Sequence, residues 1–471
     1  EMLEGFSNKG MIPVALLFLV SEGIRQSGTL GQVIKKLLPQ GKTTVFKAQL
    51  RILPSVAFIS AFLNNTPVVV IFAPIIKHWA KSVNLPATKF LIPLSYVTIL
   101  GGICTLIGTS TNLVVHGMIL EAGFEGFSMF ELGKVGIFIA IAGIIYIFLF
   151  SKRLLPDARP DTAVPDEEVE EGEKLHRVEA VLGARFPGIN KKLKDFNFQR
   201  HYGAEVKEIK TRNGQRFVSN LEEVVLHEGD TLVVMADDTF IPTWGESSVF
   251  VLLTNGNEPD TTGKKKRWFA LLLLVLMIVG ATVGELPVTK EMFPDIKLDM
   301  FFFVSITTII MAWTNLFPAR KYTKYISWDI LITIACAFAI SKAMVNSGVA
   351  DSVAKFIIGL SDDYGPHVLL AMVFIITNLF TELITNNAAA ALAFPLALSI
   401  SAQLGVSPTP FFVVICMAAS ASFSTPIGYQ TNLIVQGIGN YKFTDFVRIG
   451  LPLNIITFLI SVILIPLIWN F

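Results

Sequence analysis

The chain has 471 residues, of which 52% are hydrophobic, 11% aromatic and only 16% charged. This composition is too apolar for a soluble protein of this length and predicts a protein embedded in a lipid bilayer. The formal net charge of +1 gives no ground for a nucleic-acid partner.

Apolar stretches of about 20 residues, the length that crosses a bilayer as a helix, recur along the chain. Two further apolar segments, 50–80 and 368–403, are each interrupted near the middle by a pair of adjacent asparagines, so neither is expected to be a plain span. The uninterrupted candidates, in chain order, are 10–29, 91–118, 134–151, 268–286, 299–317, 328–346, 411–438 and 449–469.

The distribution of lysine and arginine predicts the topology. These residues flank segment 50–80 on both sides, and the positive-inside rule places both flanks in the cytoplasm. The segment is therefore predicted to be a re-entrant hairpin that enters and leaves on one side. The acidic loop 119–133 is expected outside. By the same reasoning, segment 368–403 is a second re-entrant hairpin that opens to the opposite face.

The second half of the chain repeats the first. The pair Asn64-Asn65 is matched by Asn386-Asn387, and GTSTNLVV at 108–115 is matched by GYQTNLIV at 428–435. The spacing between the copies stays near a constant value of about 320 residues, as expected for an internal repeat. Because the first copy begins outside and the second inside, the repeats are inverted, which is typical of secondary transporters with broken helices.

The asparagine pairs are predicted to form a binding site at the hairpin tips. Backbone that turns inside a bilayer is tolerated only where it is buried in protein or lines a polar cavity. Helix N-termini at such a turn favour an anion, and side-chain and carbonyl oxygens can coordinate Na⁺. Alternatively, each pair only caps a helix break, but two inverted copies favour the site. The tips contain no Lys or Arg, so an anion there needs co-bound cations, which predicts symport.

The tips N-N-T at 64–66 and N-N-A at 386–388, each followed by G-[TY]-x-T-N, resemble the divalent anion/sodium symporter family. The resemblance covers roughly residues 10–151 and 328–470. It implies a homodimer in which a transport domain moves like an elevator against a scaffold domain. It also implies substrate contacts from Asn64, Asn65, Thr66, Thr109, Asn386, Asn387, Ala388 and Tyr429, and sodium contacts from Ser60, Asn64, Asn65, Gly108, Thr385, Asn387 and Gly428.

The sequence departs from the family pattern at the substrate. Asn replaces the first Ser of both tips, and Ala388 lacks the hydroxyl that carboxylate-transporting members use. These changes favour sulfate or a related divalent oxyanion, taken up with Na⁺ across the plasma membrane. The alternatives are a sodium- or proton-coupled di- or tricarboxylate transporter, and an anion channel or transport-dead anion sensor. With no nucleophile–base pair or metal motif, an enzyme is not expected.

Residues 152–267 differ in kind from the rest. An acidic, proline-containing linker leads into a domain in which GAEVKEIKT at 203–211 and DTLVVMA at 230–236 predict strands. The domain is similar to the TrkA C-terminal (RCK-type) regulatory domain. That similarity implies a cytosolic regulatory role, while a docking or dimerisation role is an equal alternative.

The predicted fold class is an all-α polytopic membrane protein with inverted repeats, each with a re-entrant hairpin, and a small α/β cytosolic domain inserted between them. The predicted domains are the first membrane repeat at 1–151, the linker and TrkA-C-like domain at 152–267, connecting transmembrane helices at 268–327, and the second repeat at 328–471.

Glu382 is an ionisable residue five positions before Asn387, at predicted membrane depth. A charged group in such a place is a functional candidate. It could carry a proton or help to hold Na⁺. The simpler interpretation, which we favour from sequence, is a carboxylate paired with a polar partner on another helix.

Overall fold

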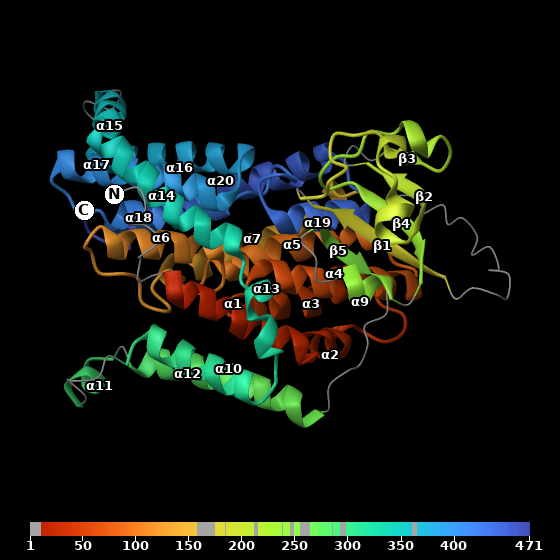
Figure 1. Ribbon diagram of the computed structural model, residues 1–471. Helices are drawn as coiled ribbons and strands as arrows, with labels where there is room; N and C mark the ends of the chain where they lie inside the picture. The colour runs from red at the N-terminus through yellow and green to blue at the C-terminus, as the bar shows by residue number, and fades with distance from the viewer. Residues whose placement is uncertain are drawn as a thin grey trace.

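The computed structural model describes residues 11–157, 175–183, 185–211, 215–237, 239–244, 249–254, 264–284, 286–292, 298–359 and 365–471. Helices form an elongated body, and a small β-sheet lies at one end of it (Figure 1). The helices of the first half are α1 (Met11–Gln26), α2 (Thr29–Leu37), α3 (Val45–Ser60), α4 (Asn65–Ser82), α5 (Leu91–Gly102), α6 (Ser110–Glu121) and α7 (Gly133–Leu154). The later helices are α8 (Phe198–Tyr202), α9 (Phe240–Trp244), α10 (Lys264–Gly284), α11 (Pro287–Met292), α12 (Met300–Trp313), α13 (Tyr322–Tyr325), α14 (Trp328–Asn346), α15 (Val349–Gly359), α16 (Gly365–Leu383), α17 (Asn386–Leu404), α18 (Thr409–Ser420), α19 (Gln430–Gly439) and α20 (Phe443–Ile468).

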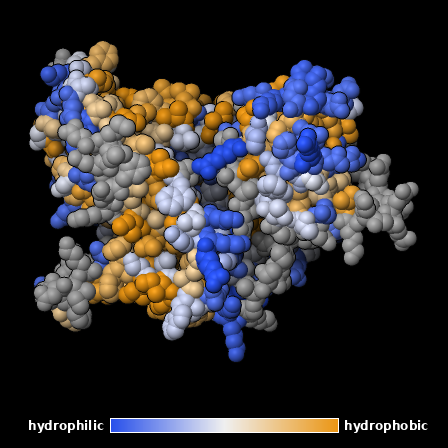
Figure 2. Space-filling view, viewed as in Figure 1, coloured by the Kyte–Doolittle hydropathy of each residue, from blue (hydrophilic) through white to orange (hydrophobic). Residues whose placement is uncertain are grey.

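The helical body has the apolar exterior of a multi-pass membrane protein. Among the described residues, the helices α7, α10, α16, α17 and α20 are long and apolar enough to cross a bilayer, and the bent pair 319–325 and 330–346 would make a sixth span. Hydrophobic residues gather over this body, and many hydrophilic residues gather at the end with the sheet (Figure 2). Helices α7 and α20 turn a stripe of exposed side chains outward: Ile137, Phe138, Ile141, Ile145, Leu149, Leu451, Ile455, Leu459 and Ile463.

Two predicted spans are wrong as continuous helices. Span 91–118 is divided into α5 and α6 by an unwound turn at 103–109, and span 411–438 is divided into α18 and α19 by a turn at 421–429. Each turn leads into the repeated G-[TY]-x-T-N motif, but a hydropathy window averages it with the apolar helices on both sides and does not detect it. The predicted interruptions at the asparagine pairs are confirmed, because α3 gives way to α4 and α16 to α17 at those positions.

The same hydrogen bonds close the two unwound turns. The amide of Asn112 donates to Thr105 O at 2.9 Å. At the equivalent place in the second half, the amide of Asn432 donates to Thr425 O at 3.1 Å. These asparagines satisfy carbonyl groups that the broken helices leave without intrahelical partners. The sequence repeat is therefore also a repeat of local structure.

The repeats point in opposite directions. Helices α4 and α17 both begin at an asparagine pair. In Figure 1, α4 runs toward the sheet, whereas α17 lies at the far end of the body. This opposite orientation is what a pseudo-two-fold axis in the membrane plane produces.

The inserted domain is an antiparallel sheet with its own hydrophobic core. Its strands lie in the order β3-β2-β4-β1-β5. The predicted strands are confirmed as β2 and β4, whereas the other three were not predicted and complete the sheet; the linker 158–174 lies outside the described residues. The strands are β1 (His176–Leu182), β2 (Glu205–Lys210), β3 (Arg216–Phe217), β4 (Thr231–Ala236) and β5 (Phe250–Thr254).

Strand β1 joins the sheet to the helical body. Val181 packs into the core of the helical body rather than into that of the sheet. Lys77 on α4 donates to both carboxylate oxygens of Glu179 at 3.1 Å, and Lys210 on β2 reaches the same carboxylate at 3.3 Å. On α19, Gly437 lies so close to the sheet that an added Cβ would be 2.5 Å from Thr231 Oγ1. The sheet thus rests on α4 and α19.

The two lysines determine the ionisation of Glu179. Burial alone would raise the pKa of this carboxyl, but the charges of Lys77 and Lys210, together with their hydrogen bonds, lower it from 4.5 to about 2. A lowered pKa means that the ionised carboxylate stabilises the folded state above the unfolded pKa. This contribution is lost as the pH falls through the folded pKa.

We predict that Glu179→Gln lowers the thermal unfolding temperature of the purified protein at pH 7. The substitution leaves Lys77 and Lys210 without their shared anion, a change that costs on the order of 3 kcal/mol for a buried pair. The difference between variant and wild type should shrink as the pH falls from 4.5 toward about 2. Glu205→Gln, which breaks the exposed pair with Lys207, is the control and should have little effect. Equal shifts for the two variants would contradict the assigned role.

Candidate functional site

Four helices begin at the centre of the helical body. They are α4, α6, α17 and α19, and their N-cap residues are Asn64, Thr109, Thr385 and Tyr429. All four caps belong to the predicted site. Each helix N-terminus carries free backbone N–H groups and a partial positive charge, so the arrangement directs four such ends into one region.

The first hairpin tip contacts the turn of the second repeat. The amide of Asn65 donates to the hydroxyl of Tyr429 at 2.8 Å. Thr109 Oγ1 lies 2.8 Å from the same hydroxyl. Ser60 donates to Asn65 Oδ1 at 2.7 Å, which fixes the orientation of the amide. These four predicted residues, Ser60, Asn65, Thr109 and Tyr429, therefore form one hydrogen-bonded cluster.

The second hairpin tip makes the reciprocal contact. The amide of Asn386 donates to Thr111 Oγ1 at 2.7 Å, and Ser110 donates to Asn387 Oδ1 at 3.1 Å. Both partners lie in the first turn of α6. Each tip thus binds the broken helix of the opposite repeat, and the two clusters meet where the four helices begin.

Oxygen atoms crowd around the glycine of the first turn. A Cβ added at Gly108 would lie 2.5 Å from Gly102 O and 2.9 Å from Ala61 O, and a Cβ at Gly102 would lie 2.6 Å from Asn65 Oδ1. Only glycine permits this approach. Carbonyl and amide oxygens are the ligands that hard cations prefer. The chemistry of this cluster fits the sodium contacts predicted for Ser60, Asn65 and Gly108.

Other predicted residues lie in the same region without joining these clusters. Thr385 Oγ1 accepts from Ala388 N at 3.4 Å, as a helix cap. Asn64 is the corresponding cap of α4, and its side chain accepts from Thr66 N. Gly428 packs so tightly that an added Cβ would meet Ser422 Oγ. Their roles in binding stay predictions.

Three polar contact residues, Ser110, Thr111 and Gln430, were not predicted. Ser110 and Thr111 bind the second tip, and Thr66 donates to Gln430 Oε1 at 3.3 Å. All three lie one or two positions after an N-cap of α6 or α19. The repeated G-[TY]-x-T-N motif contains all three residues. When the first turn of a helix faces a site, the N–H groups and side chains of its first residues are the ones exposed there.

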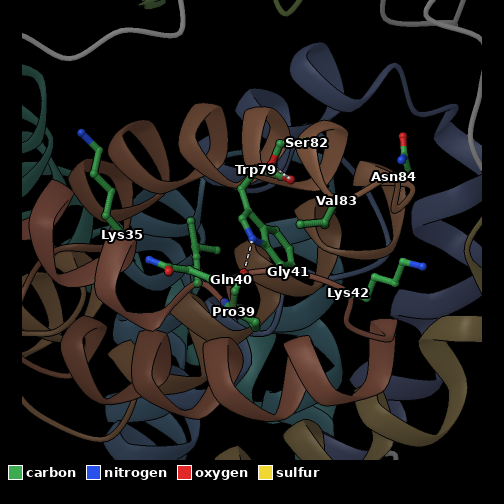
Figure 3. A pocket seen from close by; sticks show the side chains of 10 residues that line it. Lys35, Pro39, Gln40, Gly41, Lys42, Trp79, Ser82, Val83 and Asn84 are labelled. Carbon is green, nitrogen blue, oxygen red and sulfur yellow. Dashed lines mark hydrogen bonds between the residues drawn. The ribbon is translucent and has the colours of Figure 1, made fainter.

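A surface pocket of about 540 Å³ lies elsewhere, between the loop 38–42 and the C-terminal end of α4. In Figure 3 the indole of Trp79 donates to Pro39 O, and the two atoms are 2.8 Å apart. Trp79 is fourteen residues along α4 from Asn65, which corresponds to about 21 Å of helix. This pocket is therefore separate from the candidate site.

Two hairpins and two unwound helices that meet at one polar cluster inside an apolar helical body define a secondary transporter. Comparison with known proteins agrees. A profile of the family described as "Citrate transporter" matches residues 1–402 and 297–471. The chain belongs to this citrate transporter family, and it is a transporter rather than an enzyme.

Of three individual relatives, two are named as transporters and one as a response regulator. The chain is 29% identical to an uncharacterized transporter of Synechocystis sp., over 100% of this chain and 90% of that protein. It is 28% identical to a putative sulfur deprivation response regulator of Chlamydomonas reinhardtii, over 98% and 93%. It is 32% identical to a probable sodium/sulfate cotransporter 3 of the same alga, over 59% of this chain and 31% of that protein. The predicted resemblance to a symporter family is confirmed, and its TrkA-C part stays a prediction.

We predict that Tyr429→Phe destabilises the protein by about 1–3 kcal/mol, because the buried amide of Asn65 and the hydroxyl of Thr109 lose a shared partner. The measurement is the thermal unfolding temperature in detergent. Tyr322→Phe, at a half-exposed tyrosine, is the matched control and should leave it unchanged. Equal melting of wild type and Tyr429→Phe would show that the hydroxyl does not hold the two repeats together.

Proposed function

We propose that the protein is a sodium-coupled symporter for sulfate or a related divalent oxyanion. The observation that carries this proposal is the convergence of four helix N-termini at tips and turns without a Lys or Arg. Helix ends favour an anion but supply only partial charges. Full neutralisation of a divalent anion therefore requires cations that bind with it, and this requirement couples the two fluxes.

The oxygen-rich surroundings of Gly108 support sodium as that cation. Asn65 Oδ1, Gly102 O and Ala61 O lie together without a competing positive charge among the tip residues. A relative named as a probable sodium/sulfate cotransporter supports both the ion and the substrate. Ala388 lacks the hydroxyl that carboxylate-transporting members of the family use at this position. It therefore favours sulfate, which is smaller than a di- or tricarboxylate, as the substrate.

Two other functions have specific support. The description of the matching family favours citrate or another carboxylate as substrate. A relative named as a putative sulfur deprivation response regulator favours an anion sensor without transport. Competition of sulfate uptake by succinate or citrate distinguishes the first alternative. The second predicts anion binding without sodium-driven accumulation.

The proposal extends to the membrane, the oligomeric state, the side of the inserted sheet and the transport motion. We place the protein in the plasma membrane as a homodimer, with the inserted sheet in the cytoplasm and a transport domain that moves as an elevator. The insert contacts α4 and α19, the two helices that begin at Asn65 and next to Tyr429. This contact supports a regulatory role for the insert, because it restrains helices that end at the site.

We predict sodium-dependent sulfate accumulation in proteoliposomes that contain the purified protein. Asn65→Ala and Asn387→Ala should each reduce the initial rate by at least about tenfold, since each removes a buried amide worth more than about 1.4 kcal/mol. The measurement is uptake of radiolabelled sulfate with an inward sodium gradient, or with potassium in its place.

Asn346→Ala, at an exposed asparagine that ends α14, is the control and should leave uptake unchanged. Uptake of succinate instead of sulfate would contradict sulfate as the substrate but would still support a transporter. Binding of sulfate without any uptake would favour the sensor.

We also predict that Lys77→Gln raises the maximal rate of uptake by about threefold or more and leaves the KM for sulfate unchanged. Lys77 lies twelve residues along α4 from Asn65, which is about 18 Å of helix, so it cannot touch the substrate. Lys207→Gln, in an exposed ion pair of the inserted sheet, is the control. An unchanged maximal rate in Lys77→Gln would argue for a structural insert rather than a regulatory one.

A further inference from the structure

Glu382 lies near the end of α16, just before the second tip, and its side-chain partners among the described residues are neutral. Its Oε1 atom accepts from Asn454 Nδ2 at 2.7 Å and from Ser424 N at 2.9 Å. Its Oε2 atom lies 3.5 Å from Ser422 Oγ. These partners come from α20 and from the unwound turn 421–429. The carboxylate therefore sits where three parts of the second repeat meet.

No cation balances this carboxylate within the described part of the chain. Glu22 in α1 shows the usual arrangement, because Arg25 donates to it at 2.7 Å. Glu382 has no Lys, Arg or His within 4.0 Å among the described residues. A carboxylate within a membrane body costs several kcal/mol unless it is paired. Neutral donors lower this cost without cancelling the charge.

The neighbouring amide supplies a second, independent observation. Asn454 is 6% exposed, and its Oδ1 atom is buried without a hydrogen-bond partner. Its Nδ2 atom donates both to Glu382 and to Ser424 Oγ. A half-turn of the amide would bring Oδ1 beside the carboxylate and the hydroxyl. The three side chains can then present oxygen atoms to one point, which is the donor set of a hard cation.

The first repeat makes the same backbone contact without a carboxylate. Thr425 Oγ1 donates to Glu382 O at 3.1 Å, and in the first repeat Thr105 Oγ1 donates to Ala61 O in the same way. Glu382 thus takes the place that Ala61 has in the first repeat. The backbone contact is common to both halves, whereas the carboxylate is present in the second half alone.

We propose that Glu382, Ser424 and Asn454 form an additional sodium site, separate from the oxygen atoms around Gly108. This inference rests on the proposed sodium coupling and adds one sodium ion to each transport cycle. Sodium enters as the amide of Asn454 turns its oxygen toward Glu382. Because Glu382 lies on the helix that leads into the second tip, occupation of the site ties α16 to α20 and to the turn 421–429.

The first test counts sodium on the intact purified protein in the absence of sulfate. Equilibrium binding of radioactive sodium should give one ion fewer per chain for Glu382→Gln than for the wild type. Glu131→Gln, at a carboxylate that bonds Trp469 and the backbone of Ser128, is the control and should leave the count unchanged. An unchanged count in Glu382→Gln, with normal folding by size-exclusion chromatography, would overturn the site.

A second variant guards against misfolding. Asn454→Ala keeps the carboxylate but removes one ligand, so it should weaken the affinity of one sodium ion by about tenfold or more. If its sodium binding equals that of the wild type, the site is overturned. A pH dependence of uptake that Glu382→Gln abolishes, together with an unchanged sodium count, would assign a proton to Glu382 and also overturn it.

The count separates this inference from the proposed substrate. A wild type that binds sodium but transports no sulfate would overturn sulfate as substrate and leave the Glu382 result valid. A wild type that binds no sodium at all would overturn both the coupling and the additional site.

Discussion

This structure depends on one constraint: where the backbone is not helical inside the apolar body, its peptide groups still need hydrogen-bond partners. Peptide groups there have no water to bind, so each must find a partner in the protein. Asn112 and Asn432 provide such partners for the two unwound turns. Once these breaks are stable, helix ends and carbonyl oxygens become available at the centre of the body. The candidate site is built from the same groups that the breaks release.

Much of this arrangement could be predicted from the sequence, because polar pairs such as Asn64-Asn65 stand out in apolar runs and recur after a fixed interval. The repeated G-[TY]-x-T-N motif also marks a turn in each half, but the bounds of the unwound segments, 103–109 and 421–429, could not be read from it. Contacts between repeats, such as that of Asn65 with Tyr429, also depend on tertiary packing over 364 positions. Periodicity along one segment carries no information about such a distant partner.

The inserted sheet is connected to the candidate site through two helices, α4 and α19. Strand β1 touches α4 and α19, and both helices have their N-termini at the central cluster. The contacts of β1 are thus with helices whose opposite ends lie at the candidate site. The insert is linked to the candidate site through these two helices, and none of its described residues makes a contact with the tips reported above.

The reciprocal contacts of the tips make the two repeats depend on each other. Asn65 of the first repeat is completed by Tyr429 of the second, and Asn386 of the second by Thr111 of the first. Neither half holds a whole site. A substitution at either tip therefore changes a contact of both halves, although it lies in the sequence of one. Within this mutual dependence the halves are not identical, as Glu382 opposite Ala61 illustrates.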